Sequence, residues 1–390
     1  MGYTGAFEKF KKYDLFVDKH IDLEESFLKI RTLNFQSNKV MDFKPPYHPS
    51  IIPTSSNEEA ALADKEEINN NFTYPIFLPY GEKKYNRVIV LLHGLNERSW
   101  QKYMTWAAEL AQSTQSAVIL FPISYHMNRA PKQWGDPREM LPLLRDSKSQ
   151  CEGLKNSSFA NVALSERLKY EPLRFFSSGY QSADDLTMLI RLLNQGKIPF
   201  VRETPQIDFF AYSIGAFLSQ ILFIANPSGV ISNSRLFMFG GGAFFNSMNG
   251  VSKLIMDEQA FTKIFRHYND DFEKEAQKDT ILGKFLQENS LAMAFRSMLN
   301  IDRLKDFRND MLAMLKDQIY AIAPLKDSVI PPTGISSFFR SISSKNIEMV
   351  DFAYPYSHEQ PFPINGKPAL SAAVDGGFNH VFKRAANFLA

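Results

Sequence analysis

Residues 206–218, which read QIDFFAYSIGAFL, decide the fold because their periodicity changes at a single serine. The apolar, aromatic run over 206–212 is typical of a buried strand, and residues 214–225 have helical spacing. Ser213 stands at the junction, with the small residues Ala211 and Gly215 two positions to either side. A strand that turns sharply into a helix at a serine is a nucleophile elbow, which lifts the serine Oγ clear of the sheet. The stretch therefore makes Ser213 a candidate nucleophile.

The elbow pattern departs from the usual Gly-x-Ser-x-Gly at its first position, where this chain has Ala211. Alanine is still small enough for the turn. Taken alone, the pattern also fits an ordinary serine that caps a helix after a strand. The choice between these two interpretations depends on the rest of the chain.

Length and composition restrict the class of protein. A chain of 390 residues suits one large α/β domain with insertions, or two domains. The formal charge of +2 gives no indication of a nucleic-acid partner or an anionic membrane. Cys151 is the single cysteine, so an internal disulfide is excluded. The chain has neither a signal-like start nor an apolar run long enough to span a bilayer, so we expect a cytoplasmic protein, although a removed signal peptide would leave no trace.

Apolar strands alternate with amphipathic helices along most of the chain. Strands are expected over 87–92, 116–123, 206–212, 235–239, 318–323 and 346–354, and helices over 99–113, 180–193, 333–341 and 378–389. This alternation predicts an α/β fold with a doubly wound, mostly parallel sheet.

Three regions fall outside the alternation. Residues 1–80 are expected to pack as an N-terminal extension on the outside of the core, with helical periodicity over 13–33, a Pro-rich connector over 44–49 and helix character over 57–70. Residues 81–245 and 317–390 form the predicted core. Residues 246–316 are strongly helical, so they predict a movable helical cap over the pocket, with an apolar set at Phe285, Leu291, Met293, Phe295 and Met298.

Two further candidate groups follow strands that come after Ser213. Asp327 lies in the run APLKDSVIPP over 323–332, and His358 follows the strand expected to end at residue 354. His380 is the alternative histidine, at the start of the last helix, and His267 lies in the helical insertion. We favour His358 because a base that must become positively charged is disfavoured at a helix N-terminus.

With these motifs the chain resembles the α/β-hydrolase superfamily, over roughly residues 86–245 and 317–390. Serine, acid and histidine follow one another in that order in the superfamily. Its acid often lies in an Asp-x-(Val/Ile)-(Val/Ile)-Pro turn, which 327–331 match. The resemblance implies that Ser213 is the nucleophile, that His358 is the general base and that Asp327 orients the imidazole. An ordinary Asp turn remains the alternative for Asp327.

The resemblance also implies an oxyanion hole made of two backbone N–H groups. One belongs to Ile214, directly after the nucleophile. The other is expected in the loop HGLN over 93–96, at Leu95 or, second, at Asn96, with His93 in a structural role.

A long polar and aromatic loop follows the strand 116–123. We consider four of its residues as substrate-binding groups, with an arginine that grips an anion; the alternative is a loop held by its own salt bridges. They are His126, Arg129, Trp134 and Arg138. No metal-ligand pattern is found, and the Gly run over 240–242 lacks the spacing of a dinucleotide loop, so we expect no metal and no cofactor.

These features predict a serine hydrolase that cleaves a carboxylic ester of a small-molecule substrate through an acyl-enzyme. The 34 phenylalanines and the helical insertion favour an apolar or aromatic acyl part. A peptidase or amidase with the same three residues is one alternative. A catalytically silent scaffold that binds a ligand or partner is another. The sequence leaves the oligomeric state open.

Overall fold

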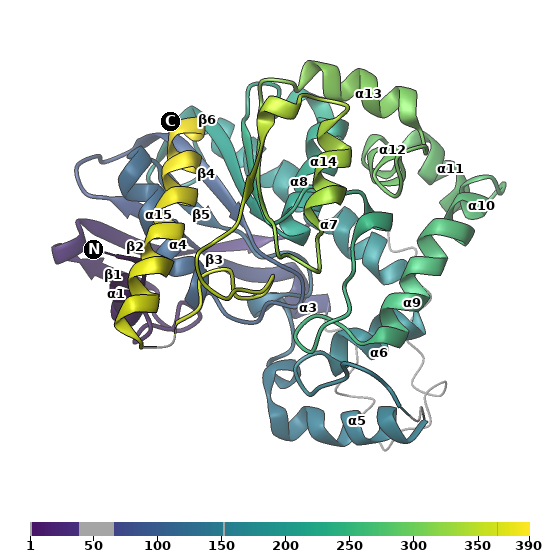
Figure 1. The fold of residues 1–390 in the computed structure, drawn as a ribbon. Helices are drawn as coiled ribbons and strands as arrows, with labels where there is room; N and C mark the ends of the chain where they lie inside the picture. Colours follow the sequence, from purple (N-terminus) through teal and green to yellow (C-terminus); the bar gives the residue numbers. More distant parts are fainter. Residues whose placement is uncertain (1, 39–65, 151–152, 365) are drawn as a thin grey trace.

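A computed structural model describes residues 2–38, 66–150, 153–364 and 366–390 of the chain. Its centre is a nine-stranded sheet with the order β1-β2-β3-β5-β4-β6-β7-β8-β9, formed within these residues (Figure 1). The strands are β1 (His20–Leu23), β2 (Leu28–Gln36), β3 (Asn71–Pro79), β4 (Tyr85–Leu92), β5 (Ala117–Leu120), β6 (Val201–Tyr212), β7 (Leu236–Phe239), β8 (Ile319–Pro324) and β9 (Ile347–Val350).

Strands β5, β4, β6, β7, β8 and β9 pair in parallel, and β1, β2 and β3 add an antiparallel edge. The chain places β4 between β5 and β6, so the direction in which strands are added reverses there. The predicted class is confirmed: this is a doubly wound, mostly parallel sheet with the α/β-hydrolase arrangement.

Helices cover both faces of the sheet because its central strands are apolar on both faces. Alternate residues of β4 show this: Ile89 and Leu91 pack in one core, and Val88 and Val90 in the other. The first core is covered by α1 (Tyr3–Phe10), α4 (Gln101–Thr114) and α15 (Pro368–Leu389). The second is covered by α7 (Leu173–Asn194), α8 (Ile214–Ala225) and α14 (Pro332–Phe339) (Figure 1).

The region expected to be helical over 246–316 contains five α-helices among the described residues. They are α9 (Glu258–Arg266), α10 (Phe272–Ala276), α11 (Ile281–Glu288), α12 (Ser290–Ser297) and α13 (Lys305–Met314). The long connection after β5 contains two helices, α5 (Pro137–Gln150) and α6 (Val162–Tyr170); α6 packs on α9, and α5 packs on α6 (Figure 1). The described residues of 124–177, where no periodicity was found, therefore contain two complete α-helices and the start of α7.

The prediction for the N-terminal region is wrong in part. Residues expected to be helical over 13–33 contain β1 and most of β2, and these strands extend the sheet instead of packing outside it. At the start of β2, Leu28 and Ile30 are buried while Lys29 is exposed, the period of two that is typical of a strand. The short helix α3 (Glu66–Asn70) precedes β3. The connector over 44–49, most of the helix expected over 57–70, and Cys151 lie outside the described residues.

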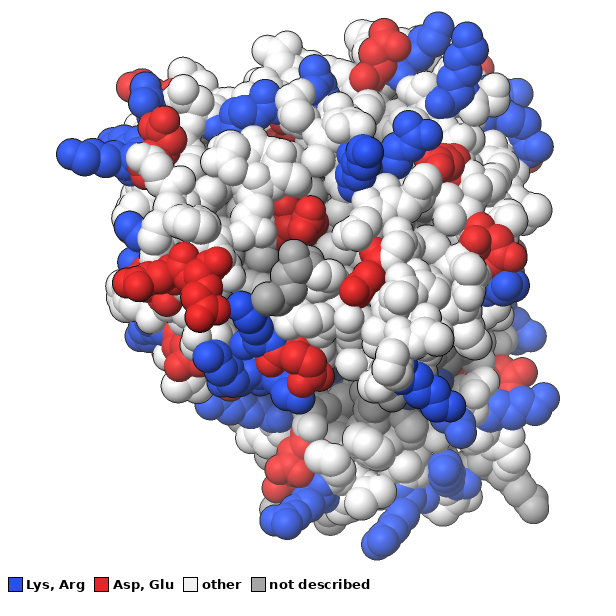
Figure 2. Space-filling view, turned by 60° about the vertical axis from the view of Figure 1, so that its left-hand side comes forward, with Lys and Arg blue, Asp and Glu red and all other residues white. Residues whose placement is uncertain are grey.

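Acidic and basic side chains lie next to one another over much of the face in Figure 2, in keeping with the small formal charge of +2. In the described ranges, no helix combines the length and the apolar character that a bilayer crossing requires.

Candidate active site

Strand β6 ends at Tyr212 and helix α8 begins at Ile214, so Ser213 is the whole turn between them. Its backbone has φ 57° and ψ −122°, a conformation that few residues other than glycine adopt. Strain of this kind costs on the order of 1–3 kcal/mol and persists only where the surrounding structure enforces it. The predicted elbow is thus present in the backbone, at the carboxyl end of a central strand.

Two glycines allow this turn to pack closely. A Cβ on Gly215 would lie 2.8 Å from Leu92 Cβ and 2.9 Å from the His93 carbonyl oxygen. A Cβ on Gly241, two residues after the end of β7, would lie 2.6 Å from Ala216 Cβ and 2.9 Å from the Ser213 carbonyl oxygen. The Gly run over 240–242 therefore supports the elbow from the neighbouring strand.

Replacing Gly241 by alanine should destabilise the fold by about 1–3 kcal/mol, the typical cost of an added group in a packed site. The matched control is Gly376→Ala inside α15, where a Cβ would meet nothing within 4 Å. That change should stabilise the protein by roughly 0.5–1 kcal/mol, since glycine is unfavourable inside a helix. Urea unfolding measures both, and a neutral Gly241→Ala would contradict the close packing at the elbow.

The structure brings Ser213, His358 and Asp327 together in one chain of hydrogen bonds. Ser213 Oγ lies 2.7 Å from His358 Nε2, and His358 Nδ1 lies 2.7 Å from Asp327 Oδ2. All three side chains are buried. Because a carboxylate only accepts hydrogen bonds, Nδ1 donates to Asp327 and Nε2 is the nitrogen that can accept from the Ser213 hydroxyl.

The two carboxylate oxygens of Asp327 have different partners, one in the backbone of its own turn and one in His358. Its Oδ1 accepts hydrogen bonds from the N–H groups of Val329 and Ile330, each at 2.9 Å, while Oδ2 faces His358. The two interpretations of this residue from the sequence are therefore compatible, since one oxygen orders the turn and the other is left for the histidine.

His380, the alternative base, lies elsewhere. Its Nε2 is 2.7 Å from Glu348 Oε1 at an exposed position on α15. The histidine that lies between Ser213 and an acid is His358.

Tyr212 holds the loop that carries His358. Its hydroxyl donates a hydrogen bond to the backbone carbonyl of His358, and its ring stacks on the imidazole at 5.5 Å between centroids. Burial raises the pKa of Tyr212 well above its ordinary value, so the hydroxyl keeps its proton. The sequence offered no signal for this contact beyond the position of a tyrosine directly before the serine.

Helix α4 joins the same histidine loop to the loop after β4. Lys102 forms an ion pair with Glu97 and donates to the Glu359 carbonyl at 3.2 Å. Tyr103 donates to Glu97 at 2.9 Å and accepts from the Gly94 N–H at 2.9 Å. Helix α4 therefore bonds both the loop that follows β4 and the loop that carries His358.

The two residues predicted for the oxyanion hole lie beside Ser213. Leu95 and Ile214 line a small cavity of about 40 Å³ together with Ser213 itself. Among the described residues, neither backbone N–H has a hydrogen-bond partner. His93 holds the base of this loop: its Nε2 accepts from the Ile123 N–H at 2.9 Å, and burial lowers its pKa to about 3, so it stays neutral.

The four residues considered for substrate binding divide into two pairs. His126 and Trp134 line a second cavity of about 80 Å³, and burial lowers the pKa of His126 well below its ordinary value. Arg129 is fully buried, bonded to Asp185 at 2.7 Å and to backbone carbonyls, so it is a structural residue. Arg138 is exposed on α5 and lines none of the cavities described here. The buried salt bridge favours the structural alternative for Arg129, and the role of Arg138 in binding stays a prediction.

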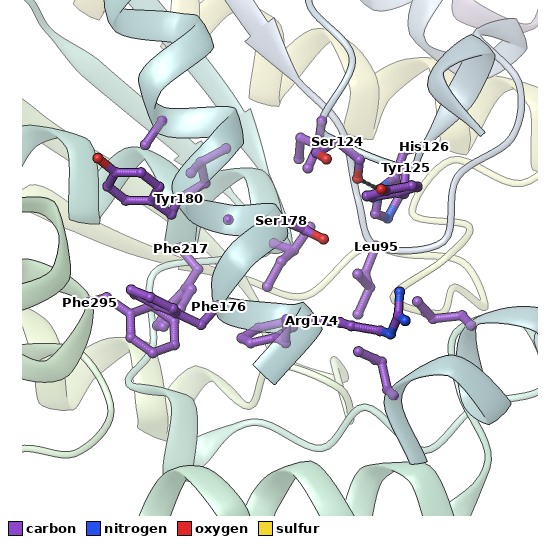
Figure 3. Close-up of a pocket in the computed structure, with 18 of the residues that line it drawn as sticks. Leu95, Ser124, Tyr125, His126, Arg174, Phe176, Ser178, Tyr180, Phe217 and Phe295 are labelled. Carbon is purple, nitrogen blue, oxygen red and sulfur yellow. Dashed lines mark hydrogen bonds between the residues drawn. The ribbon is translucent and has the colours of Figure 1, made fainter. Parts of the chain in front are cut away.

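Sequence reasoning missed most of the lining of the second cavity. Figure 3 shows aromatic side chains at one end and polar groups with Leu95 at the other. The aromatic end contains Phe176, Tyr180, Phe217 and Phe295, and the polar end contains Tyr125, His126 and Arg174. Most of these come from α7, α8 and α12, where helical spacing alone does not separate cavity lining from core.

No group of three or more His, Cys, Asp or Glu side chains is placed to hold a metal ion in the part of the chain that the structure describes. The absence of a cofactor stays a prediction.

A family model described as "Family of unknown function (DUF6051)" matches residues 1–390. The chain belongs to DUF6051. A search of curated proteins gives no match to this DUF6051 chain.

Solved structures with a similar chain path include a thermostable esterase from Pseudomonas putida, at 10% identity and TM-score 0.44 over 98% of the DUF6051 chain and 87% of the esterase. Carboxyl esterase 2 from Tuber melanosporum matches at 11% identity and TM-score 0.40 over 82% of each chain. A peroxisomal alpha-beta-hydrolase from Saccharomyces cerevisiae matches at 11% identity and TM-score 0.41, over 92% of the DUF6051 chain and 90% of the hydrolase. At these identities and scores, the likeness carries no information about the activity of the DUF6051 chain.

Proposed function

We propose that this chain is a serine hydrolase that cleaves carboxylic esters with an apolar acyl part through an acyl-enzyme. The observation that carries the proposal is the hydrogen-bonded chain Ser213–His358–Asp327, with 2.7 Å at each step. Distances of about 2.6–3.2 Å allow direct proton transfer between a nucleophile and its base.

In the proposed reaction, His358 takes the hydroxyl proton as Ser213 Oγ attacks the ester carbonyl carbon. Asp327 stabilises the imidazolium that forms. The carbonyl oxygen becomes negatively charged and accepts hydrogen bonds from the N–H groups of Ile214 and Leu95. His358 then gives its proton to the leaving alcohol, and water hydrolyses the acyl-enzyme by the same steps. Losing one oxyanion donor typically costs about 10²–10³ in rate.

The apolar acyl part is supported by the surroundings of Ser213. The cavity that contains Ser213 is lined by apolar side chains, which include Phe245, Met248, Phe261, Ile264 and Ile330. Phe261 and Ile264 belong to α9 and line the cavity that contains Ser213, which supports the proposal that the region 246–316 acts as a cap. Its movement and its role as a separate cap remain a proposal.

Labelling with a fluorophosphonate probe tests the proposed function. The probe phosphonylates an activated serine, so a serine hydrolase is labelled and a silent scaffold is not. Parallel assays with a 4-nitrophenyl ester and the matching anilide separate an esterase from an amidase, since the same three residues serve both. Absence of labelling in folded protein would refute the proposal.

Replacing Tyr212 by phenylalanine should lower kcat by about 10-fold or more, because a displaced base costs much of the rate even when the pocket is intact. KM should change little, since Tyr212 contacts the histidine loop and lines none of the cavities described here. Tyr320→Phe is the control, because that hydroxyl bonds Glu348 at 3.1 Å, beside the exposed His380. Equal rates for the two variants would show that the Tyr212 hydroxyl does not position His358.

A further inference from the structure

Two cavities and a cleft meet around Ser213. The small cavity that contains Ser213 shares Leu95, Phe175 and Ile214 with the aromatic cavity of about 80 Å³. It also shares Leu95 and Ile255 with a larger cleft of about 490 Å³. The serine therefore lies between an aromatic space on one side and the cleft on the other.

The lining of the two spaces differs in chemistry. No carboxylate lines the aromatic cavity, and its charged lining residues are Arg167 and Arg174. Its rings pack on one another: the ring centroids of Phe176 and Phe295 lie 5.0 Å apart, and those of Phe217 and Phe295 lie 6.1 Å apart. The cleft is lined in part by charged and amide side chains, among them Glu97, Arg98, Lys102, Glu359 and Gln360, and in part by aromatic and aliphatic ones. An apolar chain is stabilised in the first space, whereas a polar alcohol and water are better accommodated in the second.

The position of the reacting carbonyl determines which half of an ester, acyl or alcohol, occupies which of the two spaces. If the N–H groups of Ile214 and Leu95 hold the carbonyl oxygen, the acyl carbon lies where the small and the aromatic cavities meet. The chain that follows it then leads past Phe175. We propose that the aromatic cavity is an acyl-chain subsite for linear apolar acyl groups of medium length, an inference that rests on the proposed function. Phe175 is then the gate, the residue that sets how far the acyl chain enters the cavity.

Of the three residues that line both the small and the aromatic cavity, Phe175 is the one that can be changed without altering the proposed oxyanion donors. Ile214 and Leu95 belong to the elbow and to the loop after β4, whereas Phe175 lies in the first turn of α7. Its half-buried ring packs on Phe245 and Tyr268, each at 5.6 Å between centroids. Removing the ring should join the two cavities, since both are lined by it.

The test is a series of 4-nitrophenyl esters with acyl chains from two to twelve carbons. For the wild type, kcat/KM should rise roughly 4-fold per added methylene until the subsite is full, and then fall. Phe175→Ala should move the optimum to longer chains, with a gain of about 10-fold on the dodecanoate. Leu291→Trp, which fills the cavity from α12, should move the optimum to shorter chains.

Two controls separate the subsite from general effects. Phe159→Ala removes an exposed ring at the cleft and should leave the acyl profile unchanged. Acetate esters of lengthening alcohols, followed by proton release, should give a flat profile. The assignment of the aromatic cavity would be overturned if kcat/KM did not depend on the length of the acyl chain but rose steeply with the length of the alcohol. The role of Phe175 as the gate would be overturned if the optimal acyl length were unchanged in both Phe175→Ala and Leu291→Trp.

A binding experiment tests the acyl-chain subsite independently of ester hydrolysis. Calorimetric titration of the Ser213→Ala variant with hexanoate, octanoate and decanoate should give tighter Kd values with each methylene, and Leu291→Trp should remove the gain. If the wild type hydrolyses esters but neither binding nor rate depends on chain length, the subsite is wrong and the proposed function stands. Chain-dependent binding without any hydrolysis or probe labelling would leave the subsite and refute the proposed function.

Discussion

Ser213→Ala is expected to lose about 10⁶ in kcat on a 4-nitrophenyl ester and all labelling by a fluorophosphonate. The reason is that the proposed reaction depends on a bond between the serine Oγ and the acyl carbon, and among the described residues no second hydroxyl group is hydrogen-bonded to the imidazole of His358. The fold should survive, because the backbone of the elbow is enforced by the close packing of Gly215 and Gly241 rather than by the Oγ.

The matched control for this variant is Ser337→Ala, which removes an exposed hydroxyl that bonds the Thr333 carbonyl at 3.0 Å. Its rate and labelling should equal those of the wild type. Thermal unfolding of both variants checks that the loss does not come from misfolding. Full activity of well-folded, pure Ser213→Ala would exclude Ser213 as the nucleophile.

The second large effect is expected at His358. His358→Ala should lower kcat by about 10⁶, nearly as much as loss of the nucleophile, because residues of such a triad act as a unit. The double variant with Ser213→Ala should therefore be scarcely slower than either single variant. Addition of the two losses would mean that the residues act independently.

His380→Ala is the comparison that separates the two candidate histidines. The contact of His380 with Glu348 is exposed, and exposed ion pairs contribute little to stability. Activity should therefore stay near that of the wild type. A large loss in His380→Ala with an active His358→Ala would transfer the role of base to His380.

Much of the core could be predicted because its signals are local. The strand β6, the helix α8 and the glycine pattern at Ser213 lie within a few residues of one another. The same is true of β8 and the Asp327 turn, and of the strand β9 before His358, although β9 is shorter than expected. Parallel strands place their carboxyl ends at one sheet edge, so residues that follow them lie close together.

Errors and open alternatives occurred where distant segments determine the structure. The residues of β2 became a strand because β3, some forty residues later, pairs with them. Arg129 was considered for binding an anion, but Asp185 of α7 occupies its guanidinium inside the core. Neither partner can be identified from the short stretch in which the residue lies.

By itself, the sequence determined the parallel core and the order in which Ser213, Asp327 and His358 follow its strands. Periodicity and turn chemistry act over a few residues, and one chain shows them directly. Only the tertiary structure decided that His358 rather than His380 faces Ser213. It alone placed Phe175 between two cavities and Tyr212 under the histidine loop. These contacts join segments far apart in the chain, and they depend on packing that no local pattern encodes.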